Sequence, residues 1–272
     1  MERKVVLVTG GSSGIGLATC QYLQQKGCTV YGTSRKARNG ELLHGITMLQ
    51  LYTEDPKSIA SAVSWLIEKE GRIDVLINNA GTGIAGAIED TSTEEMVSLF
   101  TTNVFGQLEC CRAVIPYMRT QNKGQIINMS SIAGEFGLPF RGVYSASKSA
   151  IDRFSETLRM ELKQWNIAVS IVQPGDYKTN INHNRIIAKR SLDKDSPYYE
   201  GFTKLYKAIS EDISNGHDPI GVAKVVWKIV DSKYPLMRYP AATFWQRFSL
   251  SVNRVLPFHL FQKILLKRFP IK

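Results

Sequence analysis

Tyr144 and Lys148 stand four residues apart in a segment with a helical pattern. Residues at positions i and i+4 of a helix lie one above the other on the same face, so these two side chains would be neighbours. A phenol has an unperturbed pKa of about 10, too high for proton transfer near neutral pH. An adjacent ammonium group favours the phenolate and lowers that pKa. The pair could therefore be an acid and the group that tunes it, although such pairs are also common surface contacts.

The length and composition are those of a globular protein that can bury a sizeable core. The chain has 272 residues, 43% hydrophobic and 21% charged, which suits one large α/β domain or two small ones. No run approaches the roughly 18 apolar residues that span a bilayer, and the first residues do not read as a signal peptide. The four cysteines and four histidines show no metal-binding spacing. We therefore expect a cytoplasmic protein with reduced thiols and no metal.

The positive charge is concentrated at the C-terminal end. The net charge is +10, yet residues 238–272 hold seven basic residues and no acidic ones, so the other 237 residues carry only +3. A basic tail on a nearly neutral domain indicates contact with an anionic surface and argues against a DNA-binding core. We expect no nucleic-acid partner.

A glycine-rich segment lies between a predicted strand and a predicted helix near the N-terminus. The apolar run Val5–Val8 ends at Thr9, and a helical pattern follows the glycines. In this context Gly10 permits a tight turn, Gly14 lets the backbone approach a pyrophosphate, and Gly16 allows close helix–strand packing. A plain glycine–serine loop is the simpler alternative, but the context favours a dinucleotide site.

This segment resembles that of the short-chain dehydrogenase/reductase family, whose loop reads T-G-x-x-x-G-I-G. The resemblance covers roughly residues 3–240 and rests on six motifs in the family's order. It implies a Rossmann fold and an enzyme that transfers hydride between a nicotinamide cofactor and a carbonyl/alcohol pair. The cofactor contacts implied here are Thr9, Gly10, Ser12, Ser13, Gly14, Ile15 and Gly16.

The residues after the second predicted strand indicate which dinucleotide is used. Dinucleotide folds often place an acidic residue here to bind the ribose 2′-hydroxyl, whereas this chain has Ser34, Arg35 and Lys36. Serine and arginine can hydrogen-bond a 2′-phosphate that a carboxylate would repel, so we predict NADP(H). A solvated basic turn is the alternative. Tyr52 stands where family members usually carry an aspartate near the adenine, so that contact departs from the family pattern.

Two further motifs complete the predicted cofactor site. The family's N-N-A-G motif is matched at 78–81, where the implied contacts are Asn78, Ala80 and Gly81. The segment after the sixth predicted strand resembles P-G-x-x-x-T, which in the family holds the nicotinamide carboxamide. Its implied contacts are Pro174, Gly175, Tyr177 and Thr179, with Tyr177 in place of a small apolar residue.

The resemblance also implies a catalytic set of Asn103, Ser131, Tyr144 and Lys148. Tyr144 would protonate the developing alkoxide, and Ser131 would hydrogen-bond the same oxygen. Lys148 would lower the pKa of Tyr144 and contact the nicotinamide ribose, and Asn103 would hold a water linking Lys148 to solvent. Ser131 is preferred to Ser130 because it lies 13 residues before Tyr144, the family's spacing. A capping asparagine is the alternative role for Asn103, and the substrate contacts expected are Ser131, Phe136, Tyr144 and Tyr177.

Strands alternating with helices predict one domain over 1–240, built on a doubly wound parallel sheet of about seven strands. Strands are expected at 5–8, 29–33, 46–51, 74–77, 125–129, 168–172 and 236–239. Helices are expected at 58–70, 93–100, 104–118, 142–165 and 218–231, with an interruption at Asn103. The ends of several strands would gather at one edge of the sheet, where such folds bind ligands.

The remaining segments point to the substrate and partners. Aromatic residues in the loop 180–217 could contact substrate or simply pack, and the basic amphipathic extension 241–272 could meet a membrane surface, cover the cleft or form an oligomer contact. We hypothesise a lipophilic carbonyl substrate, with 3-ketosphinganine and steroid ketones as leading cases. The resemblance implies a homodimer or homotetramer formed through the helices at 104–118 and 142–165. A binding-only regulator that uses NADP(H) without turnover is the alternative class.

Overall fold

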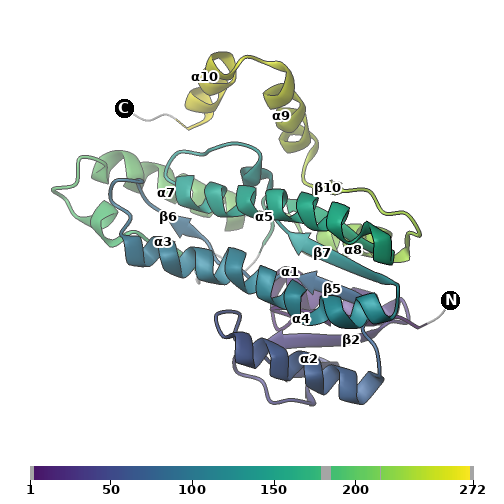
Figure 1. Ribbon diagram of the computed structural model, residues 1–272. Coiled ribbons are helices and arrows are strands. Elements are labelled where there is room, and N and C mark those ends of the chain that lie inside the picture. Colours follow the sequence, from purple (N-terminus) through teal and green to yellow (C-terminus); the bar gives the residue numbers. More distant parts are fainter. Residues whose placement is uncertain (1–2, 179–184, 215, 270–272) are drawn as a thin grey trace.

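Eight strands form one central sheet in the computed structural model, which describes residues 3–178, 185–214 and 216–269 (Figure 1). Seven strands are parallel, in the order β10, β8, β7, β5, β1, β2, β4. This order confirms the predicted doubly wound parallel sheet. The strands are β1 (Val5–Val8), β2 (Thr29–Ser34), β4 (Ile46–Gln50), β5 (Val75–Asn78), β7 (Gly124–Met129), β8 (Ile167–Pro174) and β10 (Arg238–Ala241).

An eighth strand, β3 (Glu41–Leu43), pairs antiparallel with β4 at the edge of the sheet. Its tight turn passes through His44 and Gly45, both with positive φ. This strand was not predicted, because its three residues are largely exposed and show no alternating apolar pattern.

The alternation of side chains along β1 explains why helices cover both faces of the sheet. Val5 and Leu7 belong to one buried cluster, and Val6 and Val8 belong to the other. The first cluster is completed by helices α2 (Pro56–Glu70) and α4 (Gly106–Thr120), and the second by α1 (Gly14–Gln25) and α8 (Ile220–Asp231). A four-residue strand that is apolar throughout is thus buried from both sides.

The chain between α2 and β8 carries most of the predicted catalytic residues. Helix α3 (Thr93–Phe100) runs into a π-helical turn, Thr101–Phe105, before α4 begins, so the predicted interruption at Asn103 is confirmed. Helix α5 (Gly142–Glu161) is shorter than predicted because the chain then forms a 3₁₀ turn, Lys163–Trp165, and reverses at Asn166 in the left-handed conformation.

A small second sheet and a helix lie in the segments after β5 and β8. Strand β6 (Ile84–Ala85) pairs with β9 (Ile186–Ile187), and helix α7 (Tyr199–Ser214) follows. On α7, Phe202 and Leu205 are buried, and the Phe202 ring packs 5.6 Å from that of Phe140. These aromatic positions therefore contribute packing, one of the two roles considered for the loop.

The C-terminal extension forms two helices, α9 (Phe244–Val255) and α10 (Phe258–Arg268), which stand at one end of the molecule (Figure 1). Phe261 is only 1% exposed and its ring lies 5.0 Å from that of Phe136. The Gln246 amide donates a 2.6 Å hydrogen bond to the Asp176 carboxylate. The extension therefore packs on the domain through one face. Among the described residues, no helix is long and apolar enough to cross a membrane.

Candidate active site

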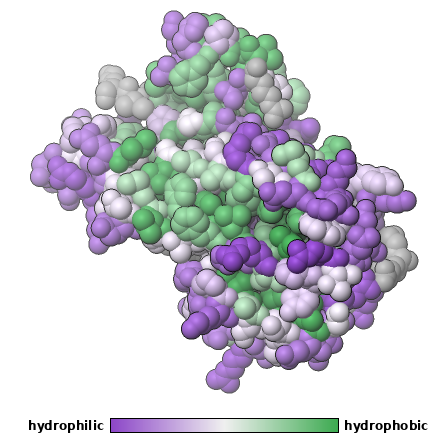
Figure 2. All heavy atoms as spheres, viewed as in Figure 1, coloured by the Kyte–Doolittle hydropathy of each residue, from purple (hydrophilic) through white to green (hydrophobic). Residues whose placement is uncertain are grey.

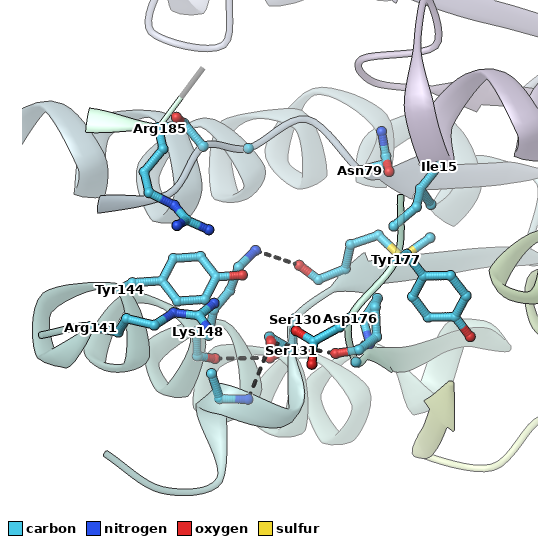
Figure 3. Close-up of a pocket in the computed structure, with 16 residues that line it drawn as sticks. Ile15, Asn79, Ser130, Ser131, Arg141, Tyr144, Lys148, Asp176, Tyr177 and Arg185 are labelled. Atoms are coloured by element: carbon cyan, nitrogen blue, oxygen red, sulfur yellow. Dashed lines mark hydrogen bonds between the residues drawn. The ribbon is translucent and has the colours of Figure 1, made fainter. Parts of the chain in front are cut away.

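A pocket opens where the carboxyl ends of four neighbouring strands meet, and Figure 3 shows its lining. Residues directly after β5, β7 and β8 line it, together with Ile15 from the glycine segment and two residues of α5. Parallel strands all end at the same edge of the sheet, so segments distant in sequence converge there. The pocket is lined by Ile15, Asn79, Gly81, Thr82, Met129, Ser130, Ser131, Ala133, Arg141, Tyr144, Lys148, Pro174, Gly175, Asp176, Tyr177 and Arg185.

Tyr144 and Lys148 lie side by side on α5 and both are buried against the pocket. The Lys148 ammonium nitrogen is 5.7 Å from the centroid of the Tyr144 ring and donates a 3.0 Å hydrogen bond to the Met129 carbonyl (Figure 3). Burial lowers the pKa of Lys148, while the nearby Tyr144 and Asp152 oppose that shift. The predicted pair is therefore held in a dry site in which its electrostatic interaction is strong.

Two serines follow β7, and the structure gives them different partners. The Ser131 hydroxyl accepts from the Ala133 amide at 3.2 Å and donates to the Pro174 carbonyl at 3.4 Å. The Ser130 hydroxyl donates to the Lys148 carbonyl at 3.2 Å and also contacts Asp152. Ser130 is thus bound to the backbone of α5, whereas Ser131 sits between the ends of β7 and β8.

Asn103 is fully buried in the π-helical turn. Its amide accepts a 2.8 Å hydrogen bond from the Thr82 amide and donates to the Thr82 carbonyl at 2.9 Å. It also donates to the Ser147 hydroxyl at 3.3 Å. Asn103 therefore ties the segment after β5 to helix α5, rather than capping a helix. A Cβ atom on Gly81 would lie 3.1 Å from the Asn103 carbonyl oxygen and 3.8 Å from the Lys148 nitrogen, so Gly81 lets these groups approach.

The glycine segment has the shape that a pyrophosphate cradle requires. Gly10 and Gly14 both have positive φ, which glycine adopts without strain. A side chain on Gly16 would collide with the Gly10 carbonyl and come within 2.6 Å of the Asn79 amide nitrogen. Within the described residues the Ser13 side chain makes no capping hydrogen bond, so the first amides of α1 are left for a ligand. The segment therefore fits a dinucleotide phosphate.

The two asparagines of the N-N-A-G segment have different surroundings in the structure. Asn78 is fully buried, and its amide donates to the Asn128 carbonyl oxygen at 2.9 Å and to the Gln107 backbone carbonyl at 3.1 Å. Its side chain therefore joins β5 to β7 and α4 and does not line the pocket. The next residue, Asn79, lines the pocket and donates to the Thr9 carbonyl at 2.9 Å. The motif itself was visible in the sequence, but which asparagine faces outward depends on where β5 ends.

The other predicted cofactor residues occupy the same edge of the sheet. Thr9 is buried, and its hydroxyl accepts from the Asn79 and Ala80 amides, both at 2.9 Å. Ser34 is the last residue of β2, and the exposed Arg35 and Lys36 follow it. The Ser34 hydroxyl accepts a 3.2 Å hydrogen bond from the Lys36 amide. Tyr52 is exposed after β4. Pro174, Gly175 and Tyr177 line the pocket, and Thr179 lies outside the described residues.

The predicted substrate residues divide into two groups. Ser131, Tyr144 and Tyr177 line the pocket, but Phe136 does not, because its ring packs under Phe261 of α10. Covering the cleft was one of the roles considered for the extension, but the contact with Phe136 was not predicted. This contact could not be predicted, because it joins a loop to a helix more than a hundred residues away in the sequence.

Sequence analysis missed two arginines and an aspartate. Arg141 and Arg185 line the pocket beside Tyr144, and Arg141 could have been found because it precedes Tyr144 by three residues. Arg185 carries no motif. Asp152 is buried one turn after Lys148, where burial raises its pKa and hydrogen bonds from Ser130 and Gln173 partly oppose the shift.

Comparison with known proteins agrees with this geometry. A model of the short chain dehydrogenase family matches residues 4–189. The chain is 42% identical over 238 residues to a 3-ketodihydrosphingosine reductase of Bacteroides thetaiotaomicron, covering 88% of this chain and 87% of that protein. It is 34% identical over 255 residues to human retinol dehydrogenase 8, covering 86% and 80% of the two chains.

Solved structures show the same relationship. A short-chain dehydrogenase from Streptomyces avermitilis superposes with a TM-score of 0.81 at 29% identity, covering 98% of this chain and 96% of that one. A serine dehydrogenase complexed with NADP⁺ superposes with a TM-score of 0.73 at 26% identity, covering 87% and 93%. The parallel sheet, the glycine cradle and the buried tyrosine–lysine pair thus have one explanation: the chain belongs to the short-chain dehydrogenase family and is an NAD(P)(H)-dependent oxidoreductase acting on alcohol/carbonyl pairs.

Proposed function

We propose that this protein uses NADPH to reduce the carbonyl group of a lipophilic substrate, a long-chain lipid ketone. The observation that carries the proposal is the convergence of Tyr144, Lys148 and Ser131 on one pocket next to the glycine cradle. The names of two relatives, a 3-ketodihydrosphingosine reductase and a retinol dehydrogenase, support a lipid substrate. The first cases to assay are 3-ketosphinganine and a steroid ketone.

The proton-transfer step follows from the positions of the side chains. The bound nicotinamide would supply the hydride to the carbonyl carbon. Tyr144 would donate its phenolic proton to the carbonyl oxygen as negative charge develops there, and the Ser131 hydroxyl would donate a hydrogen bond to the same oxygen. Lys148 would favour the phenolate left on Tyr144 through its positive charge, since its nitrogen lies 5.7 Å from that ring.

Asn103 would complete the path by which the site regains its proton. Its carbonyl oxygen accepts one hydrogen bond from Thr82, which leaves a second lone pair. That lone pair, near the Lys148 nitrogen across Gly81, would hold a water leading from Lys148 to solvent. Asn103 is thus a positioning residue in this proposal.

The turn after β2 supports NADP(H) as the preferred cofactor. Arg35 and Lys36 are exposed at the end of the strand, close to where a dinucleotide fold places the adenosine ribose. A 2′-phosphate would be attracted by both cations and could accept a hydrogen bond from Ser34.

The direct test is NADPH oxidation with a panel of carbonyl compounds, comparing the wild type with Tyr144→Phe. The panel contains 3-ketosphinganine, a steroid ketone and small polar ketones. We expect turnover of a lipid ketone and a loss of about 10² to 10⁴-fold in Tyr144→Phe, the usual contribution of a general acid. Equal turnover by the two proteins would show that Tyr144 is not the proton donor, and no turnover by either would favour the binding-only alternative. Turnover of small polar ketones alone would show that the lipid substrate is wrong.

We also propose that the C-terminal extension holds the protein on anionic membranes. The face of α9 and α10 that does not pack on the domain exposes large apolar side chains, and Trp245 is 74% exposed (Figure 2). The rings of Phe244, Trp245 and Phe248 contact one another, and Arg247 is exposed between them. Aromatic side chains next to cations, with no acidic residue in the extension, suit an anionic lipid surface.

Flotation with liposomes tests this second proposal. Full-length protein should float with vesicles that contain an anionic phospholipid, and less with neutral vesicles or at high salt. Replacing Phe244, Trp245 and Phe248 by serine should abolish flotation, while Met160→Ser, which changes an exposed apolar residue of α5, should leave it unchanged. Equal flotation of the triple variant would show that the extension serves only packing or oligomer contacts.

A further inference from the structure

Two arginines flank the catalytic tyrosine, and neither has a role in the reaction described above. The guanidinium carbon of Arg141 lies 5.1 Å from the centroid of the Tyr144 ring. Arg185 comes from the other wall of the pocket, and its side chain points toward the same ring (Figure 3). The reacting carbonyl must reach the Tyr144 hydroxyl, so whatever the substrate carries next to that carbonyl meets these two cations.

Arg185 is buried, yet no carboxylate of the described residues forms an ion pair with it. It is 8% exposed, and within the described part of the chain its Nη1 atom has no hydrogen-bond partner. Its guanidinium contacts the ring of Tyr206, 5.9 Å from the centroid, and donates a hydrogen bond to the Tyr206 side chain. Burial, together with the charge of Arg141, lowers the pKa of Arg185. Leaving a guanidinium donor buried and unpaired costs free energy, and such groups are normally paired.

Among the described residues that line the pocket, no carboxylate is paired with this cation. Among its described lining residues the acidic one is Asp176, which accepts the hydrogen bond from Gln246 of α9. Figure 3 places Asp176 beside Ser131 and Tyr177, on the side of the pocket away from Arg185. The described lining around Tyr144 therefore presents Arg141 and Lys148 from one wall and Arg185 from the other, with no carboxylate facing Arg185.

An aromatic cluster holds both arginines in place. Arg141 directly follows Phe140, whose ring packs on Phe202 at 5.6 Å, and the Phe202 ring lies 5.4 Å from that of Tyr206. Tyr206 in turn contacts the Arg185 guanidinium. The two cations are thus anchored to one packed surface, which fixes their separation from the reacting atoms.

We infer that the substrate carries an anionic group, a carboxylate or a phosphate, within a few bonds of the carbonyl that is reduced, and that Arg185 binds this group with support from Arg141. This inference rests on the proposed reductase function and names the polar end of its lipid substrate. A guanidinium can hold such an anion with two parallel hydrogen bonds, and burial strengthens them. An ammonium group in the same place, as in the aminoketone 3-ketosphinganine, would meet two like charges.

Three ketones of equal chain length test the inference directly. Each compound is tetradecan-2-one substituted on C1, the carbon next to the carbonyl. The substituent is a phosphate ester, a hydroxyl or an ammonium group. With NADPH, we expect kcat/KM to be highest for the phosphate compound, by about 10-fold over the hydroxyl compound and more over the ammonium compound. These factors correspond to the ~1.5–3 kcal/mol of a hydrogen bond to a charged group.

Substitutions of Arg185 test whether this residue causes the preference for the phosphate ketone. Arg185→Gln should lower kcat/KM for the phosphate ketone by about 10- to 100-fold, mainly through KM, and change the hydroxyl ketone by less than about 3-fold. Arg185→Lys should recover part of the loss, and dodecyl phosphate should inhibit the wild type more strongly than Arg185→Gln. The control Arg153→Gln, an exposed arginine on α5, should behave as wild type. Thermal unfolding of each variant shows whether it is folded.

Three results would overturn the inference. Equal kcat/KM for the three wild-type reactions, or a preference for the ammonium compound, would show that the pocket does not select an anion while leaving the reductase function intact. An equal loss on all three ketones in a folded Arg185→Gln would make Arg185 a structural residue. Failure to reduce any of the three would count against the proposed function itself, and with it the inference.

Discussion

The Lys148 ammonium group donates a 3.0 Å hydrogen bond to the Met129 carbonyl at the end of β7 while lying 5.7 Å from the Tyr144 ring. This bond ties α5 to the strand that leads into Ser130 and Ser131. The lysine is thus both a charge beside the phenol and a positioning contact between a helix and the sheet. Burial of the Lys148 ammonium group lowers the stability of the folded protein. The same burial strengthens the electrostatic effect of this charge on Tyr144.

Replacing Lys148 by methionine should separate activity from stability. Methionine nearly matches the length of lysine but removes the charge, so we expect kcat to fall about 10² to 10⁴-fold. The melting temperature should be at least that of the wild type, because burial already disfavours the charged form of Lys148. Steady-state kinetics and thermal unfolding measure the two quantities. Lys57→Met, an exposed lysine on α2, is the control, and a large fall in melting temperature would contradict the interpretation.

Gly16→Ala should disrupt the glycine cradle. Its new Cβ atom would collide with the Gly10 carbonyl, so the backbone must shift at a cost of about 1–3 kcal/mol in unfolding free energy. Cofactor affinity, followed by NADPH fluorescence, should fall together with stability. Gly137→Ala provides the comparison, because a Cβ atom there meets nothing within 4 Å. Unchanged NADPH affinity in Gly16→Ala would mean that the cofactor does not bind at this loop.

Ser34→Asp should move the cofactor preference toward NADH. A carboxylate at the end of β2 would repel a 2′-phosphate and could bind a ribose hydroxyl. We expect the ratio of kcat/KM for NADPH to that for NADH to fall by about 10-fold or more, mainly through KM for NADPH. Assays with both cofactors, on wild type and variant, measure the ratio. Ser249→Asp, on α9, controls for added negative charge. If the wild type prefers NADH, the prediction that Ser34, Arg35 and Lys36 bind the 2′-phosphate of NADP(H) is wrong.

Asp152 should make stability depend on pH in the acid range. The pKa of Asp152 in the folded protein is raised above its ordinary value of 3.8. At a pH between 3.8 and the folded pKa, the folded state therefore binds more protons than the unfolded state. Stability contributed by the protonated form is therefore present below pH 3.8 and is lost as pH rises through the folded pKa. Denaturant unfolding from pH 3.5 to 7 measures this dependence.

Asp152→Asn removes the titrating group. The unfolding free energy of this variant should therefore increase relative to that of the wild type as pH rises through the same window. The gain is about 1.4 kcal/mol for each unit by which the pKa is raised. Asp195→Asn, an exposed aspartate, should follow the wild-type curve. Parallel curves for Asp152→Asn and the wild type would show that burial does not shift the pKa of this group.

Local patterns were sufficient to predict most of the sheet and the position of the interruption near Asn103. Val5–Val8 read as a strand buried on both faces, and the structure places its alternate residues in two different clusters. The interruption at Asn103 was expected and is a π-helical turn. Each of these features depends on residues close in sequence, whose periodicity and spacing carry the information. The edge strand β3 was missed because it is short and exposed.

The sequence by itself determined the fold class, the reaction chemistry and the pairing of Tyr144 with Lys148, because helical spacing brings together residues four apart. Only the tertiary structure decided that Asn79 faces the pocket while Asn78 is buried, and that Phe136 packs under α10. It also decided that Arg185 and Arg141 line the same pocket as Tyr144. Those relationships join segments far apart along the chain, and they depend on how helices and loops pack on the sheet, which no local pattern records.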